Sequence, residues 1–131
     1  VFGNYYGSSK KLVTLKLKQG KNIIFDIDWQ GTRQIRNKKL NYKLTTFFIL
    51  PPSKEELLKR LIKREKKNMK TVKKRMKGFT KDLSRWTEYD YVIINDDLNN
   101  CYKKIMKVIR NKKKISFDRE FIQKHVKKLL N

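Results

Sequence analysis

Two aspartates, Asp26 and Asp28, are the residues whose type and spacing point most directly to chemistry. They lie two positions apart near the end of an apolar run, residues 23–29, so in a strand both side chains would project from one face. Open parallel sheets bind ligands at the carboxyl ends of their strands, and two carboxylates at this edge suggest a ligand site. The structural alternative is that they cap the following helix or pair with a cation such as Arg33 or Arg36.

Two arginines, Arg64 and Arg75, flank a predicted helix junction. The basic segment between them has few apolar anchors before Met69, so it could close over a bound phosphate. A planar guanidinium can form two hydrogen bonds to phosphate oxygens, and its charge stays fixed near neutral pH. A solvated run of charge explains this stretch equally well.

Residues 4–8 combine an amide, two phenols, a glycine and a hydroxyl, which could form either a polar ligand surface or an ordinary turn. Cys101 is the only cysteine and His125 the only histidine, so the sequence has no cluster with zinc-ligand spacing. We expect Cys101 to be a core residue on a helix and His125 to be a surface or boundary residue.

Three apolar runs predict strands, at residues 23–29, 45–50 and 89–94, and their apolar character on both faces indicates a parallel sheet. Helices are predicted between and after them. Three of them are expected at residues 32–39, 69–86 and 98–111, the last capped by residues 95–97. A further helix should begin with a capping box formed by Ser53 and Glu56, and a last one should begin at about Ser116. Strands alternating with helices predict an α/β fold.

Length and charge limit the possible functions. The 131 residues fit one domain, and 35 Lys and Arg against 12 Asp and Glu give a formal charge of +23. Most of the cations are Lys, which favours general compositional drift over a selected nucleic-acid surface, where Arg and aromatic residues would gather. Without a long apolar run, we expect a soluble, cytoplasmic protein with no membrane partner and no specific nucleic-acid partner.

Four segments resemble bacterial guanylate kinases in order and spacing: residues 2–9, 26–31, 48–53 and 95–97. The resemblance implies a P-loop nucleoside-monophosphate-kinase-like parallel sheet flanked by helices and incomplete at the N-terminus. It also implies transfer of the γ-phosphoryl group of ATP to GMP, with Mg²⁺ as cofactor and ATP and GMP as partners. Residues 1–131 would form a partial domain: 1–20 the end of the GMP-binding region, 21–62 core, 63–77 lid, and 78–131 core and C-terminal helices.

On the GMP side, the resemblance implies roles for three residues. Tyr6 would hydrogen-bond the GMP phosphate, while Ser8 and Asp28 would contact the guanine base. A carboxylate suits this task because guanine offers N–H donors that adenine lacks.

On the ATP side, the resemblance implies that Asp26 stands near the transferring phosphate and its Mg²⁺ shell. Arg64 and Arg75 match the lid arginines that close over the phosphates, and Asn95 would lie beside the adenine of ATP. Alignment and positive charge are the main contributions a protein makes to phosphoryl transfer.

Two departures separate the sequence from the family pattern. The phosphate-binding loop Gly-x-x-x-x-Gly-Lys-Ser/Thr does not occur in these 131 residues, so we expect a truncated form that is inactive alone. The lid, which usually carries Gly-Arg-Gly followed by acidic residues, reads Lys-Arg-Glu-Lys-Lys-Asn-Met-Lys at residues 63–70. The alternatives are a non-catalytic interaction module of the same family and, ranked third, a basic nucleic-acid-binding protein.

Overall fold

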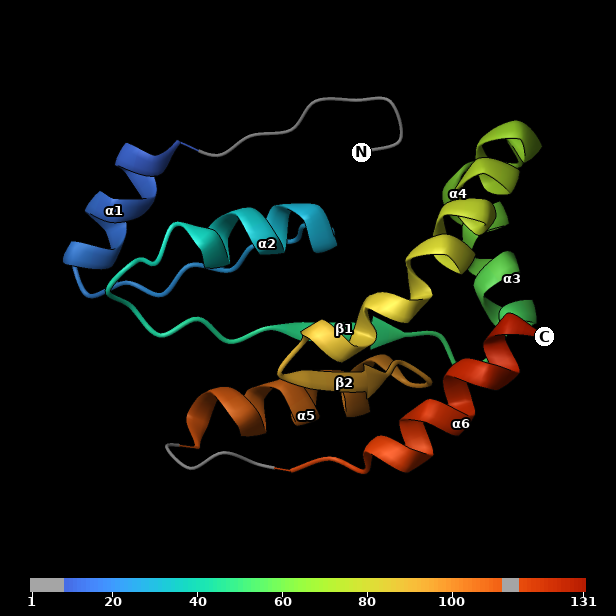
Figure 1. Cartoon of the computed structure of the whole chain (residues 1–131). Helices are drawn as coiled ribbons and strands as arrows, with labels where there is room; N and C mark the ends of the chain where they lie inside the picture. The colour runs from blue at the N-terminus through green and yellow to red at the C-terminus, as the bar shows by residue number, and fades with distance from the viewer. Residues whose placement is uncertain (1–8, 112–115) are drawn as a thin grey trace. The chain divides into compact units, whose positions relative to one another are not determined.

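The computed structural model of the chain describes residues 9–111 and 116–131, which belong to two units, residues 1–44 and 45–131. Figure 1 shows the elements of each unit. The first unit contains α1 (Lys10–Lys18) and α2 (Trp29–Asn37). The second contains β1 (Phe47–Leu50), α3 (Lys54–Arg64), α4 (Met69–Asp82), the 3₁₀ helix η1 (Leu83–Glu88), β2 (Tyr91–Ile94), α5 (Leu98–Arg110) and α6 (Arg119–Leu130).

The second unit is built on a parallel pair of strands. The register places Phe47 opposite Tyr91 and Leu50 opposite Ile94. The chain leaves β1, runs through α3, α4 and η1, and returns in β2, so the predicted order of strand, helices and strand is confirmed. Three of the four residues of β2 are buried, which is typical of parallel strands covered on both faces. The predicted α/β class, a parallel sheet flanked by helices, is therefore confirmed.

The core of this unit joins the strands to η1 and α6. Its buried side chains are Leu50, Leu83, Trp86, Val92, Ile122, Val126 and Leu129. The three that come from α6 recur at steps of four and three residues, so one face of this helix is buried. On the same helix the half-buried His125 donates a hydrogen bond from Nε2 to the carbonyl oxygen of Pro51 at 2.8 Å. His125 is thus the boundary residue that the sequence indicated.

Side-chain caps fix the helix starts. Ser53 Oγ accepts from the Glu56 amide at 3.0 Å at the start of α3, and Asp97 Oδ1 accepts from the Asn100 amide at 3.0 Å at the start of α5. Both were predicted from the sequence. A capping box also requires the Glu56 carboxylate to accept from the Ser53 amide. That part of the prediction was wrong, because the carboxylate instead accepts from Arg60 Nε at 2.9 Å.

The predicted strand at residues 23–29 is wrong. Residues 21–28 have no regular secondary structure, and α2 begins at Trp29, three residues before the predicted helix start. A strand needs a neighbour to satisfy its backbone groups, and residues 9–44 contain no other strand. The alternation of side chains is nevertheless present, since Ile23 and Phe25 are half-buried while Ile24 is 88% exposed.

The single helix predicted over residues 69–86 is also wrong. The α-helix ends at Asp82 and continues as the 3₁₀ helix η1. A 3₁₀ helix has three residues per turn, so Leu83 and Trp86 lie on the same side, and both are buried. The last helix starts at Arg119 rather than near Ser116, because the Asp118 side chain caps it by accepting from the Phe121 amide at 3.0 Å.

Candidate functional site

Asp28 caps α2. Its Oδ1 accepts a hydrogen bond from the Gly31 amide at 2.9 Å, and its carbonyl oxygen accepts from the Thr32 hydroxyl at 2.9 Å. This is the structural alternative considered for the Asp26 and Asp28 pair. An ionised carboxylate has about four acceptor positions, so one capping bond leaves Asp28 able to accept from a ligand as well. Asp28 is half-buried and Asp26 is exposed.

Gly31 allows the chain to turn tightly around that carboxylate. A Cβ atom at Gly31 would lie 3.2 Å from Ile27 Cβ and 3.5 Å from Asp28 Oδ1. The first distance is shorter than ordinary van der Waals contact and the second is not, so a larger residue would require Ile27 to shift.

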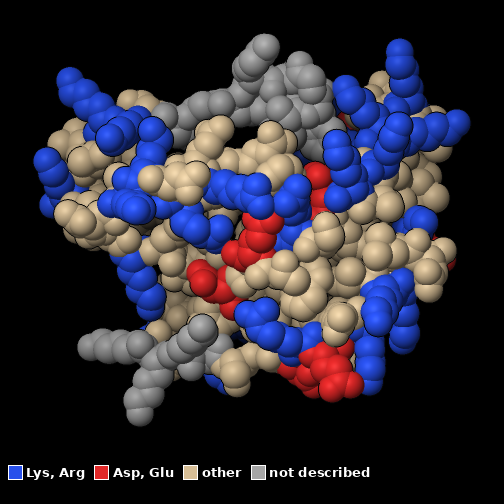
Figure 2. Space-filling model, in the orientation of Figure 1, with Lys and Arg blue, Asp and Glu red and all other residues tan. Residues whose placement is uncertain are grey.

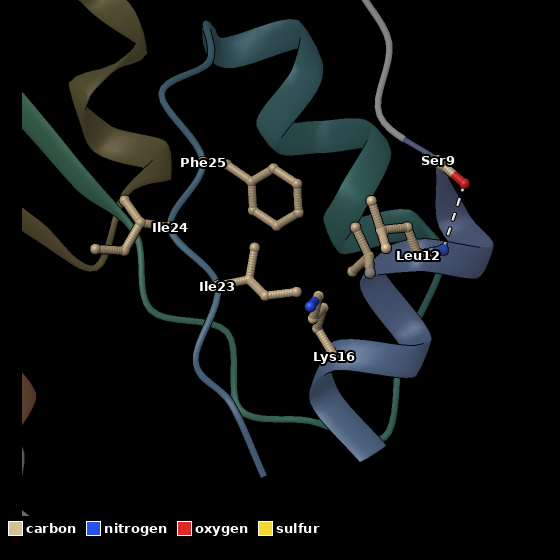
Figure 3. A pocket seen from close by; sticks show the side chains of 7 residues that line it. Ser9, Leu12, Lys16, Ile23, Ile24 and Phe25 are labelled. Carbon is tan, nitrogen blue, oxygen red and sulfur yellow. Dashed lines mark hydrogen bonds between the residues drawn. The ribbon is translucent and has the colours of Figure 1, made fainter. Parts of the chain in front are cut away.

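An apolar cavity lies between α1 and the segment that leads to Asp26. Its volume is about 370 Å³. Figure 3 shows Ile23 and Phe25 pointing toward the side of α1 that carries Leu12, while Ile24 points the other way. Ser9 lines the same cavity, but its Oγ caps α1 by accepting from the Leu12 amide at 3.3 Å. These side chains thus line the space between α1 and the segment that leads to Asp26.

The predicted lid, residues 63–77, spans the end of α3, the following turn and the first part of α4, and the two helices form a hairpin by packing against each other. Its turn is a Schellman motif: the Lys67 amide donates to the Ile62 carbonyl at 3.0 Å and the Lys66 amide donates to the Lys63 carbonyl at 3.4 Å. Lys66 and Lys67 both have positive φ, 50° and 65°, a region that favours glycine. The turn thus has glycine-like geometry without a glycine.

Arg64 and Arg75 are brought together by this hairpin. Arg75 Nε lies 2.8 Å from Glu65 Oε1, and Arg64 Nε lies 4.0 Å from the same oxygen. The Arg64 side chain is 73% exposed and the Arg75 side chain 31% exposed. Guanidinium groups from the two helices therefore face one carboxylate oxygen, Arg75 in close contact with it and Arg64 at the edge of ion-pair distance.

Arg60 is a residue that the sequence analysis missed. Its Nη1 donates to the carbonyl oxygen of Asn95 at 2.8 Å, and its Nη2 lies 3.5 Å from the carbonyl oxygen of Asp96. It thereby fixes the loop that carries Asn95. The backbone amide of Asn95 also donates to the Leu50 carbonyl, at 2.8 Å. The only sequence signal was the spacing of Glu56 and Arg60, four residues apart on a helix.

Arg60 also lines a basic groove of about 690 Å³ along α3 and the following turn. The groove residues are Glu56, Lys59, Arg60, Ile62, Lys63, Lys66 and Lys67. The single carboxylate among them is paired with Arg60 at 2.9 Å. The groove is consequently positive in character and suits an anionic ligand.

The remaining candidate residues fall into two groups. Tyr6 and Ser8 lie outside the residues that the structure describes. Cys101 is a buried core residue of α5, as predicted, and burial raises the pKa of its thiol above the ordinary value. In the described part of the chain, no group of three or more His, Cys, Asp or Glu side chains is arranged to hold a metal ion.

Figure 2 shows Lys and Arg side chains across the visible face, with Asp and Glu in a few small groups. Among residues 9–111 and 116–131, no helix has the length and apolar character that crossing a bilayer would require.

Comparisons with known proteins identify the family. The family model described as guanylate kinase matches residues 1–112. A guanylate kinase of Buchnera aphidicola subsp. Baizongia pistaciae is 48% identical over 110 residues, which are 84% of this chain and 52% of that protein. One from Jannaschia sp. (strain CCS1) is 40% identical over 129 residues, 98% of this chain and 59% of the relative. One from Rickettsia prowazekii is 47% identical over 109 residues, 83% of this chain and 54% of the relative.

The chain thus spans about half the length of the curated relatives that it matches. Within that span the match includes the Asp26–Asp28 segment, the α3–α4 hairpin and the loop of Asn95. The resemblance inferred from four short motifs is confirmed over most of the sequence. On the family match and on these relatives, the chain belongs to the guanylate kinase family.

Proposed function

We propose that this chain supplies the guanine-reading and lid parts of an ATP:GMP phosphotransferase. In this reaction the bond between the γ-phosphorus of ATP and the oxygen of the departing ADP breaks. A phosphate oxygen of GMP forms the new bond, giving GDP. The observation that supports the proposal most strongly is the convergence of Arg64 and Arg75 on one anionic oxygen at the turn of the α3–α4 hairpin.

The two arginines suit the charge distribution of the reaction. The transferring phosphoryl group carries negative charge on its equatorial oxygens, and fixed cations around it lower the barrier. Arg64 and Arg75 come from the two helices of one hairpin, so a single movement of this hairpin would bring both to the phosphates. Closure of such a lid also excludes water, which limits wasteful hydrolysis of ATP.

On the acceptor side, Asp28 would read the guanine base. Its position at the start of α2 is fixed by the bond to Gly31, and its remaining acceptor capacity can take N–H donors. Adenine would present no matching donors, so the acceptor positions of this carboxylate that Gly31 does not fill would be left without partners. Ser8 and Tyr6 are proposed to contact the base and the GMP phosphate, on the strength of the family motif.

On the donor side, Asn95 is proposed to lie beside the adenine of ATP, in the loop that Arg60 fixes. Mg²⁺ is proposed to accompany ATP. Magnesium in such sites is held by one or two carboxylates, water and substrate phosphates, and the exposed carboxylate of Asp26 fits that donor set. When bound, Mg²⁺ supplies positive charge at the phosphate oxygens.

The experiment is a hybrid enzyme in which residues 1–131 replace the matching segment of the Buchnera aphidicola relative. Formation of ADP from ATP is measured with GMP or AMP as acceptor. We expect turnover that depends on GMP, and we expect Asp28→Asn, which keeps the helix cap, to reduce the preference for GMP over AMP. Residues 1–131 alone should not turn over GMP.

Arg75 provides the sharper test of the lid. Arg75→Met should lower kcat by about 100-fold or more, because a charge that stabilises the transition state is lost. Arg85→Met is the matched control, since Arg85 also forms a partly exposed ion pair, with Glu88 at 3.1 Å. Near-normal turnover of Arg75→Met would show that its assigned role is wrong.

A further inference from the structure

Glu65 lies beside the two lid arginines, and the proposed reaction gives it no role. It follows the last residue of α3, and its side chain is 18% exposed. The backbone around it is fixed, because the Glu65 amide donates to the Leu61 carbonyl at 2.9 Å and the Asn68 amide donates to the Glu65 carbonyl at 3.0 Å. The turn therefore fixes the backbone of Glu65, and its carboxylate lies 2.8 Å from Arg75 Nε.

The surroundings of Glu65 are otherwise positive. It is the only acidic residue in the segment 63–77. Lys63, Lys66 and Lys67 lie on the adjoining groove. Its Oε1 atom makes its short contact with Arg75, at 2.8 Å, rather than with the more exposed Arg64 at 4.0 Å.

A carboxylate and a phosphate compete for the same guanidinium. Both are anions whose oxygens can form an ion pair with its fixed positive charge, as Glu65 does with Arg75. If Arg75 is to bind phosphate, its contact with Glu65 has to be exchanged for one with a phosphate oxygen. An anion of higher charge would displace the carboxylate more readily than an anion of lower charge.

We propose that Glu65 is an internal competitor for phosphate: it holds Arg75 until a polyphosphate displaces its carboxylate, and it thereby sets the affinity of the lid for phosphate. The proposal rests on the proposed function, in which Arg75 is a phosphate ligand. Glu65 acts through Arg75 and is a positioning residue. The ligand class is a linear polyphosphate, such as the triphosphate of a nucleotide.

The test measures binding of inorganic tripolyphosphate to the full chain by calorimetry at low salt, so neither guanine recognition nor turnover enters the result. Glu65→Gln removes the charge and keeps the shape of the side chain. We expect it to tighten tripolyphosphate binding about 1.5- to fivefold, the range for an exposed ion pair. Glu65→Asp should remain closer to the unmodified chain, because it restores the charge.

The matched control is Glu88→Gln. Its pair with Arg85 has a similar distance, 3.1 Å, and similar exposure, and the change in net charge is the same. A gain for Glu65→Gln that exceeds the gain for Glu88→Gln, and that disappears in the Glu65→Gln/Arg75→Met double variant, supports the proposal. Equal gains for the two Gln variants, or a gain that persists without Arg75, would overturn it.

A second measurement on the unmodified chain does not depend on the variants folding. The NMR signal of the Arg75 Nε–Hε group should move when tripolyphosphate is added, and the carboxyl carbon of Glu65 should shift with it. The Nε–Hε signal of Arg85 should not move. If the Arg75 signal moves and the Glu65 carbon signal does not, the proposed competition is wrong while the role of Arg75 in the proposed function survives. If neither signal moves, both the competition and that role of Arg75 are wrong.

Discussion

Thr46 and Asp90 form a small polar clamp beside the strand pair. The Thr46 amide and hydroxyl donate to Asp90 Oδ2 at 2.9 and 3.0 Å, and the Asp90 amide donates back to Thr46 Oγ1 at 2.9 Å. Thr46 is only 6% exposed while Asp90 is exposed, so the hydroxyl of Thr46 is the buried partner of these bonds. This clamp precedes the first ladder position, where Phe47 pairs with Tyr91.

Replacing Thr46 by Val should therefore be destabilising. Valine keeps the β-branched shape but removes the hydroxyl, leaving the Asp90 amide without its acceptor, and we expect the free energy of unfolding to fall by about 1–3 kcal/mol. Urea denaturation followed by circular dichroism measures the change. Thr80→Val is the control, because the hydroxyl of Thr80 bonds to the Met76 carbonyl at an exposed helix position. Equal losses for the two variants would show that the clamp adds nothing.

The helix cap within the candidate site could be predicted from the sequence, while the contacts of the arginines depend on folding. The sequence indicated that Asp28 could cap the following helix, because the capping bond from the Gly31 amide spans only three residues. The convergence of Arg64 and Arg75 depends on the turn at Glu65, whose geometry the sequence did not specify. The hydrogen bond from Arg60 to the Asn95 carbonyl joins residues 35 positions apart, and no local sequence pattern predicts it.

At the scale of elements, the turn between α3 and α4 carries a measurable strain. Lys66 adopts φ of 50° at the position after the helix where glycine is most common. We expect Lys66→Gly to raise the free energy of unfolding by about 0.5–1 kcal/mol, because glycine reaches this region without a Cβ clash. Thermal denaturation measures the effect.

The control for this substitution is Lys59→Gly, which lies inside α3 and lines the same groove. It removes the same charge but should lower the free energy of unfolding by about 1 kcal/mol, since glycine weakens a helix interior. Opposite signs for the two substitutions are the expected result. If Lys66→Gly lowered the free energy of unfolding, the lysine side chain would stabilise the fold by more than the positive φ destabilises it.

Elements whose signals are local were predicted well. The strands β1 and β2 and the caps at Ser53 and Asp97 agree with the sequence, because apolar runs and capping residues act over a few positions. The segment 23–29 has the apolar pattern of a strand but no partner strand in the described residues of its unit. Strand pairing is a non-local property, so an apolar run alone could not decide it.

For the whole molecule, burial is unevenly divided between the two units. All the buried apolar side chains of the described residues lie at or beyond Leu50, in the second unit. In the described part of the first unit, residues 9–44, Thr32 is the only buried residue. Because apolar burial is the main source of stability, the two units should differ in the free energy at which they open.

Native-state hydrogen exchange tests this difference directly. We expect the amides of α1 and α2 to exchange through openings of lower free energy than the amides of β1, β2 and α6. Leu129→Ala removes a core side chain that is 2% exposed, and it should lower protection in the second unit by about 2–5 kcal/mol, limited by that unit's total stability. The protection of α1 and α2 should stay unchanged, because the structure divides the chain before Thr45. Protection that is equal in the two units, and that falls equally in both after Leu129→Ala, would show instead that the chain unfolds as one cooperative unit.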